Sequence, residues 1–251
     1  MNKTVKDIRS YFIDELNNER FTTDKTGAKT IEIIGASFIA DEAAIFGTPN
    51  QDYIDAELKW YKTQSTNIST LGSIYGKEPA AWAYAANDHG EINSNYGTLI
   101  YSEKYYNQYN KALVELIQNK DTRRAIMIYN RPSIWTEYNE NYKSDFICTN
   151  AVTYYVRGDK IHAVVQMRSN DAWAGYRNDY AWAKHVLDEV VKDYNLYSDD
   201  TLVTAGDIHW QVQNLHVYAK NFYIVDHAIK TGEVHITKDE YRVLYPDSPW
   251  I

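Results

Sequence analysis

The stretch Ser144-Asp145-Phe146-Ile147-Cys148-Thr149-Asn150 contains the only cysteine of this 251-residue chain, and Gln166-Met167-Arg168-Ser169-Asn170-Asp171 follows it along the sequence. A cysteine is a useful nucleophile only as its thiolate, which a nearby guanidinium stabilises. A lone cysteine is more often a small buried apolar side chain. With Arg168 as a candidate activating group on a neighbouring segment, Cys148 indicates nucleophilic catalysis.

The composition is typical of a soluble globular protein, with 44% hydrophobic and 24% charged residues. A net charge of −8 gives no support for a general nucleic-acid surface, which needs a basic field. One cysteine excludes an intrachain disulfide framework and fits a reducing compartment. The first residues lack the apolar stretch of a signal peptide, and no apolar run approaches the ~20 residues of a membrane span. We therefore expect a cytoplasmic protein.

Hydrophobic spacing predicts a mixture of helices and strands. Helices are expected at residues 4–18, from a cap at Asn50 through Tyr61, at 103–118 and at about 179–195. Strands are expected at 30–34, 125–129, 152–156 and 161–167, with a hairpin turn at 157–160. Regular βαβ alternation and a glycine-rich dinucleotide motif are both missing from the sequence, so the predicted class is α+β. Few prolines and no Gly/Ser-rich linker favour one domain over residues 1–251.

Glu57 is a charged residue on the apolar face of the helix predicted to follow Asn50. It falls three and four positions after Ile54 and Tyr53, on the apolar face. A carboxylate on such a face must be paired, protonated or functional, because burying it bare is costly. The sequence thus leaves two interpretations open, a general acid/base and a paired core glutamate.

Taken together, these segments resemble the thymidylate synthase superfamily along most of the chain, and are most similar to its phage deoxycytidylate (dCMP) hydroxymethylase branch. The order and spacing of several short strings carry the resemblance. They are Asp24-Lys25-Thr26-Gly27, Glu57-Leu58-Lys59-Trp60, Asn95-Tyr96-Gly97, Asp121-Thr122-Arg123-Arg124, Cys148, Arg168-Ser169-Asn170-Asp171, Gly175, Asn178-Asp179 and His216-Val217-Tyr218. The resemblance implies a thymidylate synthase-like fold, a mixed sheet packed with helices, and a homodimer formed through the sheet.

The superfamily reaction begins with a thiolate adding to C6 of a pyrimidine nucleotide, after which C5 attacks the one-carbon unit of 5,10-methylenetetrahydrofolate. No metal is expected. By resemblance the catalytic residues are Cys148, Glu57 and Asp179. Nucleotide binding is assigned to Lys25, Arg123, Arg124, Arg168, Ser169, Tyr96, Asn170, His216 and Tyr218, and folate binding to Asp171, Trp82 and Gly175.

The arginine pair has an alternative interpretation, and Lys25 differs in residue type from the family pattern. The family pattern has Arg123 and Arg124 reach the other subunit's site, whereas an isolated Arg-Arg pair would be a solvated turn. Lys25 stands where thymidylate synthases usually have arginine, so it keeps the charge and loses the bidentate fork.

Asp179 is the residue that discriminates the base, since thymidylate synthases have asparagine at this place. Cytosine with N3 protonated presents two donors side by side, and a carboxylate with two acceptor oxygens is complementary to them. Asp179 could therefore stabilise the protonated intermediate more than the ground-state base. The other interpretation is a cap on the following helix. We expect dCMP rather than dUMP as the substrate.

The final step is predicted from departures around the nucleophile. Thymidylate synthases have histidine where Thr149 stands and glutamine where Met167 stands, and residues 245–251 do not resemble their closing tail. A more open pocket would admit water, which favours hydroxymethylation to 5-hydroxymethyl-dCMP over methylation. Left open are a dCMP or dUMP methylase and a CMP hydroxymethylase. From other classes come a non-catalytic nucleotide- or RNA-binding relative and a metal hydrolase, the last disfavoured because the seven histidines are scattered.

Overall fold

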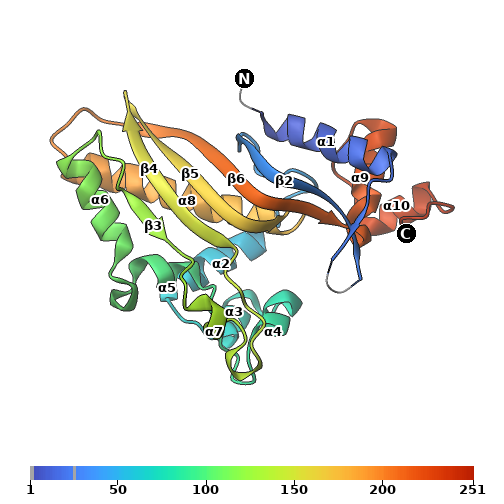
Figure 1. Cartoon of the computed structure of the whole chain (residues 1–251), viewed down its shortest axis with the longest axis horizontal. Helices are drawn as coiled ribbons and strands as arrows, with labels where there is room; N and C mark the ends of the chain where they lie inside the picture. Colours follow the sequence, from blue (N-terminus) through green and yellow to red (C-terminus); the bar gives the residue numbers. More distant parts are fainter. Residues whose placement is uncertain (1–2, 25–26) are drawn as a thin grey trace. The chain divides into compact units, whose positions relative to one another are not determined.

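A computed structural model describes residues 3–24 and 27–251 of the chain. The ten α-helices among these residues are α1 Val5–Asn17, α2 Gln51–Thr63, α3 Ile68–Tyr75, α4 Ala80–Ala85, α5 Tyr96–Tyr101, α6 Gln108–Gln118, α7 Ile134–Glu137, α8 Gly175–Tyr197, α9 Phe222–Thr231 and α10 Lys238–Leu244 (Figure 1). Three short 3₁₀ helices are η1 Glu103–Tyr105, η2 Glu140–Tyr142 and η3 Ala219–Asn221. The strands are β1 Thr22–Thr23, β2 Lys29–Ile39, β3 Ile126–Ile128, β4 Thr149–Arg157, β5 Lys160–Asp171 and β6 Thr204–Tyr218.

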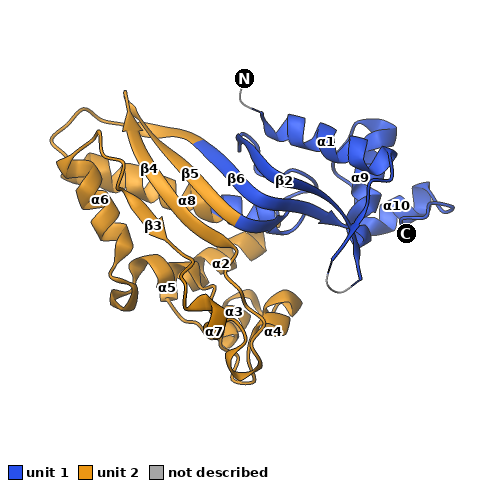
Figure 2. Ribbon diagram, in the orientation of Figure 1, with its two compact units in different colours: residues 1–49, 168–181, 208–251 blue, residues 50–167, 182–207 orange. Residues whose placement is uncertain are grey.

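The strands follow the order β1-β2-β6-β5-β4-β3 in a six-stranded sheet. The predicted α+β class, a sheet packed with helices, is confirmed. The chain divides into two compact units, each made of separated segments (Figure 2). Unit 1 comprises residues 1–49, 168–181 and 208–251, and unit 2 comprises 50–167 and 182–207. The expectation of a single domain over 1–251 stays a prediction.

In unit 1, β2 pairs antiparallel with the second half of β6, from Thr30 opposite Tyr218 to Ile39 opposite His209. The pairing runs along most of β2, which explains why the strand is longer than the predicted 30–34. Helix α1 packs against β2 and α9. It begins at a capping box in which the Thr4 N–H donates to Asp7 at 2.7 Å, as the sequence predicts.

In unit 2, β4 pairs antiparallel with β3 and with β5, and Thr149 lies opposite Met167. Helix α2 begins after Asn50, whose side chain accepts from the Tyr53 N–H at 3.1 Å, which confirms the predicted cap. The predicted helix at 103–118 is interrupted. Asn107 has φ +45° and caps α6 by accepting from the Asn110 N–H, so the chain turns before the helix begins.

Gly97 fixes how closely α5 approaches α2. A Cβ at this position would lie 1.8 Å from the backbone oxygen of Tyr61, so only glycine fits. The close approach places Tyr96 against Tyr61, with ring centroids 5.4 Å apart and nearly parallel planes. Among the described residues, none of the helices has the length and apolar character needed to cross a membrane.

Candidate active site

Cys148 is the last residue before β4 and is half-buried. Its Sγ lies 3.8 Å from the carbonyl oxygen of Phe146. On β4 itself, Thr149 is buried and its hydroxyl donates to the Tyr96 hydroxyl at 3.0 Å. The residue after the candidate nucleophile is therefore tied to the start of α5.

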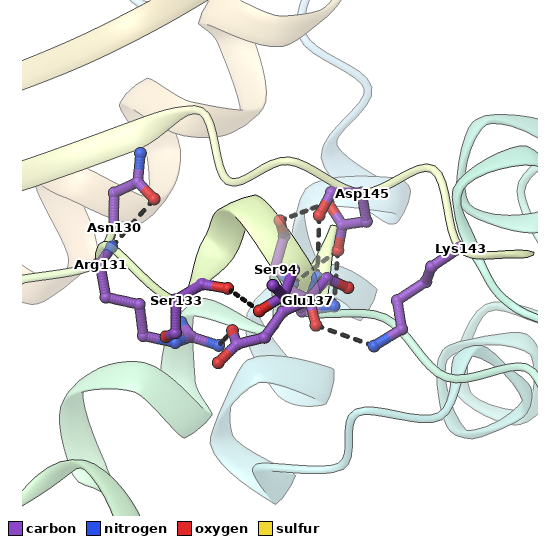
Figure 3. A network of polar contacts seen from close by, with 9 residues as sticks. Ser94, Asn130, Arg131, Ser133, Glu137, Lys143 and Asp145 are labelled. Carbon is purple, nitrogen blue, oxygen red and sulfur yellow. Dashed lines mark hydrogen bonds and ion pairs between the residues drawn. The ribbon is translucent and has the colours of Figure 1, made fainter. Parts of the chain in front are cut away.

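The segment that leads into Cys148 is held by a buried carboxylate that sequence reasoning missed. Asp145 accepts from the Asn93 N–H at 2.6 Å, from the Ser94 N–H at 2.8 Å and from the Ser94 hydroxyl at 2.6 Å (Figure 3). In return, the Asn93 side-chain amide donates to the Asp145 carbonyl at 2.9 Å. Burial raises the pKa of Asp145, and the hydrogen bonds from Ser94 and Asn93 oppose this. The backbone three residues before Cys148 is thus fixed to the loop that precedes α5.

Further polar contacts lie next to the hydrogen bonds between Asp145 and residues 93–94. Lys143 donates to the Asn93 side-chain oxygen at 2.9 Å. Beyond it, the guanidinium of Arg131 pairs with Glu137 (Figure 3). The same guanidinium lies over the Tyr105 ring, 4.8 Å from its centroid. These contacts give the loop before Cys148 a polar support within unit 2.

Glu57 is 5% exposed on α2, as its position on the apolar face predicts. Its Oε1 accepts from the Tyr53 hydroxyl at 2.6 Å and from the Trp82 indole N–H at 3.2 Å. Burial raises the pKa of Glu57 to about 7, against hydrogen bonds from Tyr53, Trp82 and Tyr61 that lower it. A carboxyl that titrates near neutral pH suits general acid/base chemistry. The sequence offered a sign of the Tyr53 contact, because the two residues are one helical turn apart.

Arg123 and Arg124 lie in the exposed segment between α6 and β3. Arg124 pairs with Glu115 at 3.0 Å while its side chain stays 79% exposed. Thr122 is buried and donates to the same Glu115 at 2.5 Å, which fixes the turn. The pair is thus presented on the surface of unit 2, an arrangement that both sequence interpretations allow.

In unit 1, the end of β5 and the start of α8 bring Asn170 and Asp179 together. The Asn170 side-chain amide, which is 4% exposed, donates to Asp179 Oδ2 at 2.8 Å. Arg168 and Ser169 precede them on β5 and are half-buried. Helix α8 begins at Gly175, earlier than predicted, so Asp179 lies inside the helix. The interpretation of Asp179 as its cap is therefore wrong.

The earlier start of α8 has a local cause in Asp171. Its Oδ1 accepts from the Trp173 N–H at 2.8 Å and from the Ala174 N–H at 3.4 Å, which turns the chain into the helix. At Gly175 a Cβ would lie 3.1 Å from the Asn170 side-chain nitrogen and 3.6 Å from Asp179 Oδ2. Glycine therefore leaves room for the bond between Asn170 and Asp179.

His216 and Tyr218 lie on β6 with their rings perpendicular and the centroids 4.8 Å apart. His216 Nδ1 is 3.0 Å from the Asn214 side-chain oxygen. Burial lowers the pKa of His216 although Asp171 acts to raise it, so the ring is neutral at pH 7 and can donate or accept a hydrogen bond. Lys25, the remaining phosphate-binding candidate, lies outside the described residues.

Three comparisons with known proteins bear on the family and the fold of the chain. The family model described as thymidylate synthase matches residues 12–240. The chain is 53% identical to the deoxycytidylate 5-hydroxymethyltransferases of Enterobacteria phages T6 and T4, in each case over 95% of this chain and 96% of the relative.

A solved structure shows the same fold. The crystal structure of thymidylate synthase from T4 phage superposes with a TM-score of 0.69 at 20% sequence identity, covering 93% of this chain and 81% of that one. The expected thymidylate synthase-like fold is therefore confirmed.

Proposed function

Because the chain belongs to the thymidylate synthase family, we propose that it converts dCMP, 5,10-methylenetetrahydrofolate and water into 5-hydroxymethyl-dCMP and tetrahydrofolate. The observation that carries the proposal is the 53% identity, over 95% of this chain, to relatives named deoxycytidylate 5-hydroxymethyltransferase. The presence of Cys148, Glu57 and Asp179 within the motifs that resemble the family supports it. The enzyme would act in the cytoplasm of a phage-infected host.

In this proposal the Cys148 thiolate adds to C6 of the cytosine. Its place at the end of a segment clamped through Asp145 supports the role, because a nucleophile must be held in a near-attack position. Arg168, Ser169 and Lys25 would bind the phosphate.

Asp179 would read the base. Its two oxygens would accept from the exocyclic amino group and from protonated N3, which stabilises the adduct more than free dCMP. The 2.8 Å bond from Asn170 to Oδ2 supports this role, because it fixes the orientation of the carboxylate.

The folate supplies a one-carbon unit at the oxidation level of formaldehyde, and Trp82, Asp171 and Gly175 would bind it. The chemistry of Trp82 fits this group: its indole N–H is engaged by Tyr53 and Glu57, and its half-exposed ring can stack on a flat ligand. Glu57 would accept a proton from the water that adds to the exocyclic carbon. A pKa near 7 supports that role, because a base must be partly ionised at neutral pH.

Product analysis tests the proposal. Purified protein is incubated with 5,10-methylenetetrahydrofolate and dCMP, dUMP or CMP in ¹⁸O-water, and the nucleotides are identified by mass spectrometry. We expect 5-hydroxymethyl-dCMP that carries ¹⁸O, together with tetrahydrofolate. A methylated product with dihydrofolate, or turnover of dUMP or CMP alone, would overturn it. Cys148→Ser should abolish turnover.

The protein is further proposed to be a homodimer in which Arg123 and Arg124 bind the phosphate in the other subunit's site. Their exposure on unit 2 supports this. Mixing inactive Cys148→Ser with inactive Arg123→Ala/Arg124→Ala should restore activity, since a heterodimer would hold one intact site. Native mass spectrometry shows when the two variants have exchanged subunits. If activity does not recover once mixed dimers have formed, this arrangement is contradicted.

A further inference from the structure

The hydroxyl group of Tyr53 stands between the Trp82 indole and the Glu57 carboxyl. It accepts from Trp82 Nε1 at 2.9 Å and donates to Glu57 Oε1 at 2.6 Å. Because an indole N–H can only donate, the contact with Trp82 leaves the Tyr53 proton for the carboxylate. The three groups therefore form a chain of hydrogen bonds with a fixed direction, and Glu57 is the final acceptor.

Tyr53 is held both at its backbone and at its ring. Its backbone N–H donates to the Asn50 side chain at the start of α2. Its ring meets Tyr75 of α3 edge-on, with centroids 5.3 Å apart and planes at 83°. The hydroxyl is thus held beside Glu57 by the fold, and loss of the hydroxyl alone leaves the packing of the ring in place.

We propose that Tyr53 is a positioning residue, whose hydroxyl orients the Glu57 carboxyl and keeps part of it ionised at neutral pH, so that it can accept the proton of the attacking water. The inference deepens the proposed function and rests on it. Neither the family model nor the names of the relatives assign a role to Tyr53.

Burial and hydrogen bonding act on the ionisation of Glu57 in opposite directions. Burial alone favours the neutral acid, and the bond from Tyr53 is the largest of those that lower the pKa of Glu57 toward about 7. The other groups that bear on the carboxyl are Trp82 of α4 and Tyr61 of α2. Without the Tyr53 hydroxyl the carboxyl would remain protonated to higher pH, and a protonated acid cannot act as a base.

Two further tyrosines pack behind the groups that contact the Glu57 carboxyl. Tyr75 of α3 packs on Tyr53, and Tyr96 of α5 stacks on Tyr61. The Tyr75 hydroxyl lies 3.5 Å from the Asn50 side-chain nitrogen. Tyr75→Phe therefore provides a matched control that also removes one tyrosine hydroxyl.

The first experiment titrates Glu57 directly. Protein labelled with ¹³C at the glutamate carboxyls is followed by NMR from pH 4 to pH 9 without ligands, and Glu57→Gln assigns the resonance. We expect the Glu57 midpoint to rise in Tyr53→Phe and to stay at the wild-type value in Tyr75→Phe. An unchanged midpoint in a folded Tyr53→Phe protein refutes the inference, whatever the enzyme proves to catalyse.

The second experiment measures the pH dependence of kcat with dCMP. Loss of a hydrogen bond to a charged group should raise the Glu57 pKa and so move the low-pH side of the kcat profile to higher pH. At pH 6 the kcat of Tyr53→Phe should therefore be about tenfold lower than that of the wild type, and at pH 9 the two values should be equal. A merely structural defect would lower kcat equally at both pH values and would contradict the inference. If wild-type protein makes no 5-hydroxymethyl-dCMP, the proposed function fails, and the NMR titration still decides whether Tyr53 controls the ionisation of Glu57.

A second variant keeps the test decisive if Tyr53→Phe is unstable. Trp82→Phe removes the donor that holds the Tyr53 oxygen and a direct contact to Glu57 Oε1. It should raise the Glu57 midpoint in the same direction. A fall, or no change, would show that the hydrogen-bond chain does not set the ionisation of Glu57.

Discussion

Replacement of Glu57 by glutamine should change how the stability of the protein depends on pH. The carboxyl is 5% exposed, and burial raises its pKa from an ordinary 4.5 to about 7. Between these values the folded protein holds a proton that the unfolded chain has released. The free energy of unfolding of the wild type therefore falls as pH rises through this window.

The magnitude follows from the width of the window. The pKa of Glu57 rises from 4.5 in the unfolded chain to about 7 in the folded protein, and each pH unit of this difference lowers the free energy of unfolding by ~1.4 kcal/mol. The total fall is about 3 kcal/mol. Glu57→Gln is neutral at every pH and keeps an oxygen that accepts from Tyr53. The variant should therefore gain about 3 kcal/mol relative to the wild type between pH 4.5 and pH 8.

Urea unfolding followed by tryptophan fluorescence measures this difference. Wild type and Glu57→Gln are unfolded at intervals from pH 4.5 to 8.5, and the difference between their free energies of unfolding is plotted against pH. Contributions of the other acids cancel in that difference because both proteins share them. A difference that stays constant across the range would refute the reasoning, since Glu57 would then titrate alike in the folded and unfolded states.

Three further variants test separate contacts. Asp179→Asn should invert the preference of kcat/KM from dCMP to dUMP, because an amide matches the donor and acceptor pattern of uracil, and an unchanged ratio would contradict the base assignment. Gly97→Ala should lower the free energy of unfolding by about 3 kcal/mol in urea, because its Cβ would lie 1.8 Å from the Tyr61 oxygen. Asp145→Ala should cost about 3 kcal/mol, because it leaves three buried donors of the segment 93–94 without their acceptor. Asp145→Ala should also slow alkylation of Cys148. If the variant matched the wild type in stability and in Cys148 reactivity, the contacts of Asp145 with residues 93–94 would not hold the segment before Cys148.

The sequence alone determined the features that depend on neighbours along the chain. The capping box of Thr4 and Asp7, the Asn50 cap and the burial of Glu57 on an apolar helical face follow from spacings of three and four residues. The order of the short motifs predicted the family, which the comparisons confirmed. Assignments of individual site residues stay predictions, to be decided by the variants above.

The tertiary structure decided which distant segments support the site residues. Asp145 meets Ser94 and Asn93 across more than fifty positions, and Thr149 meets Tyr96 across a similar distance. No local pattern marks such pairs, because a buried polar group obtains its partners from whichever segment packing brings near. The ionisation of Glu57 likewise depends on the fold, because burial raises its pKa and the hydrogen bond from Trp82 comes from another helix. The start of α8, by contrast, has a local cause, the hydrogen bonds that Asp171 accepts from residues two and three positions ahead.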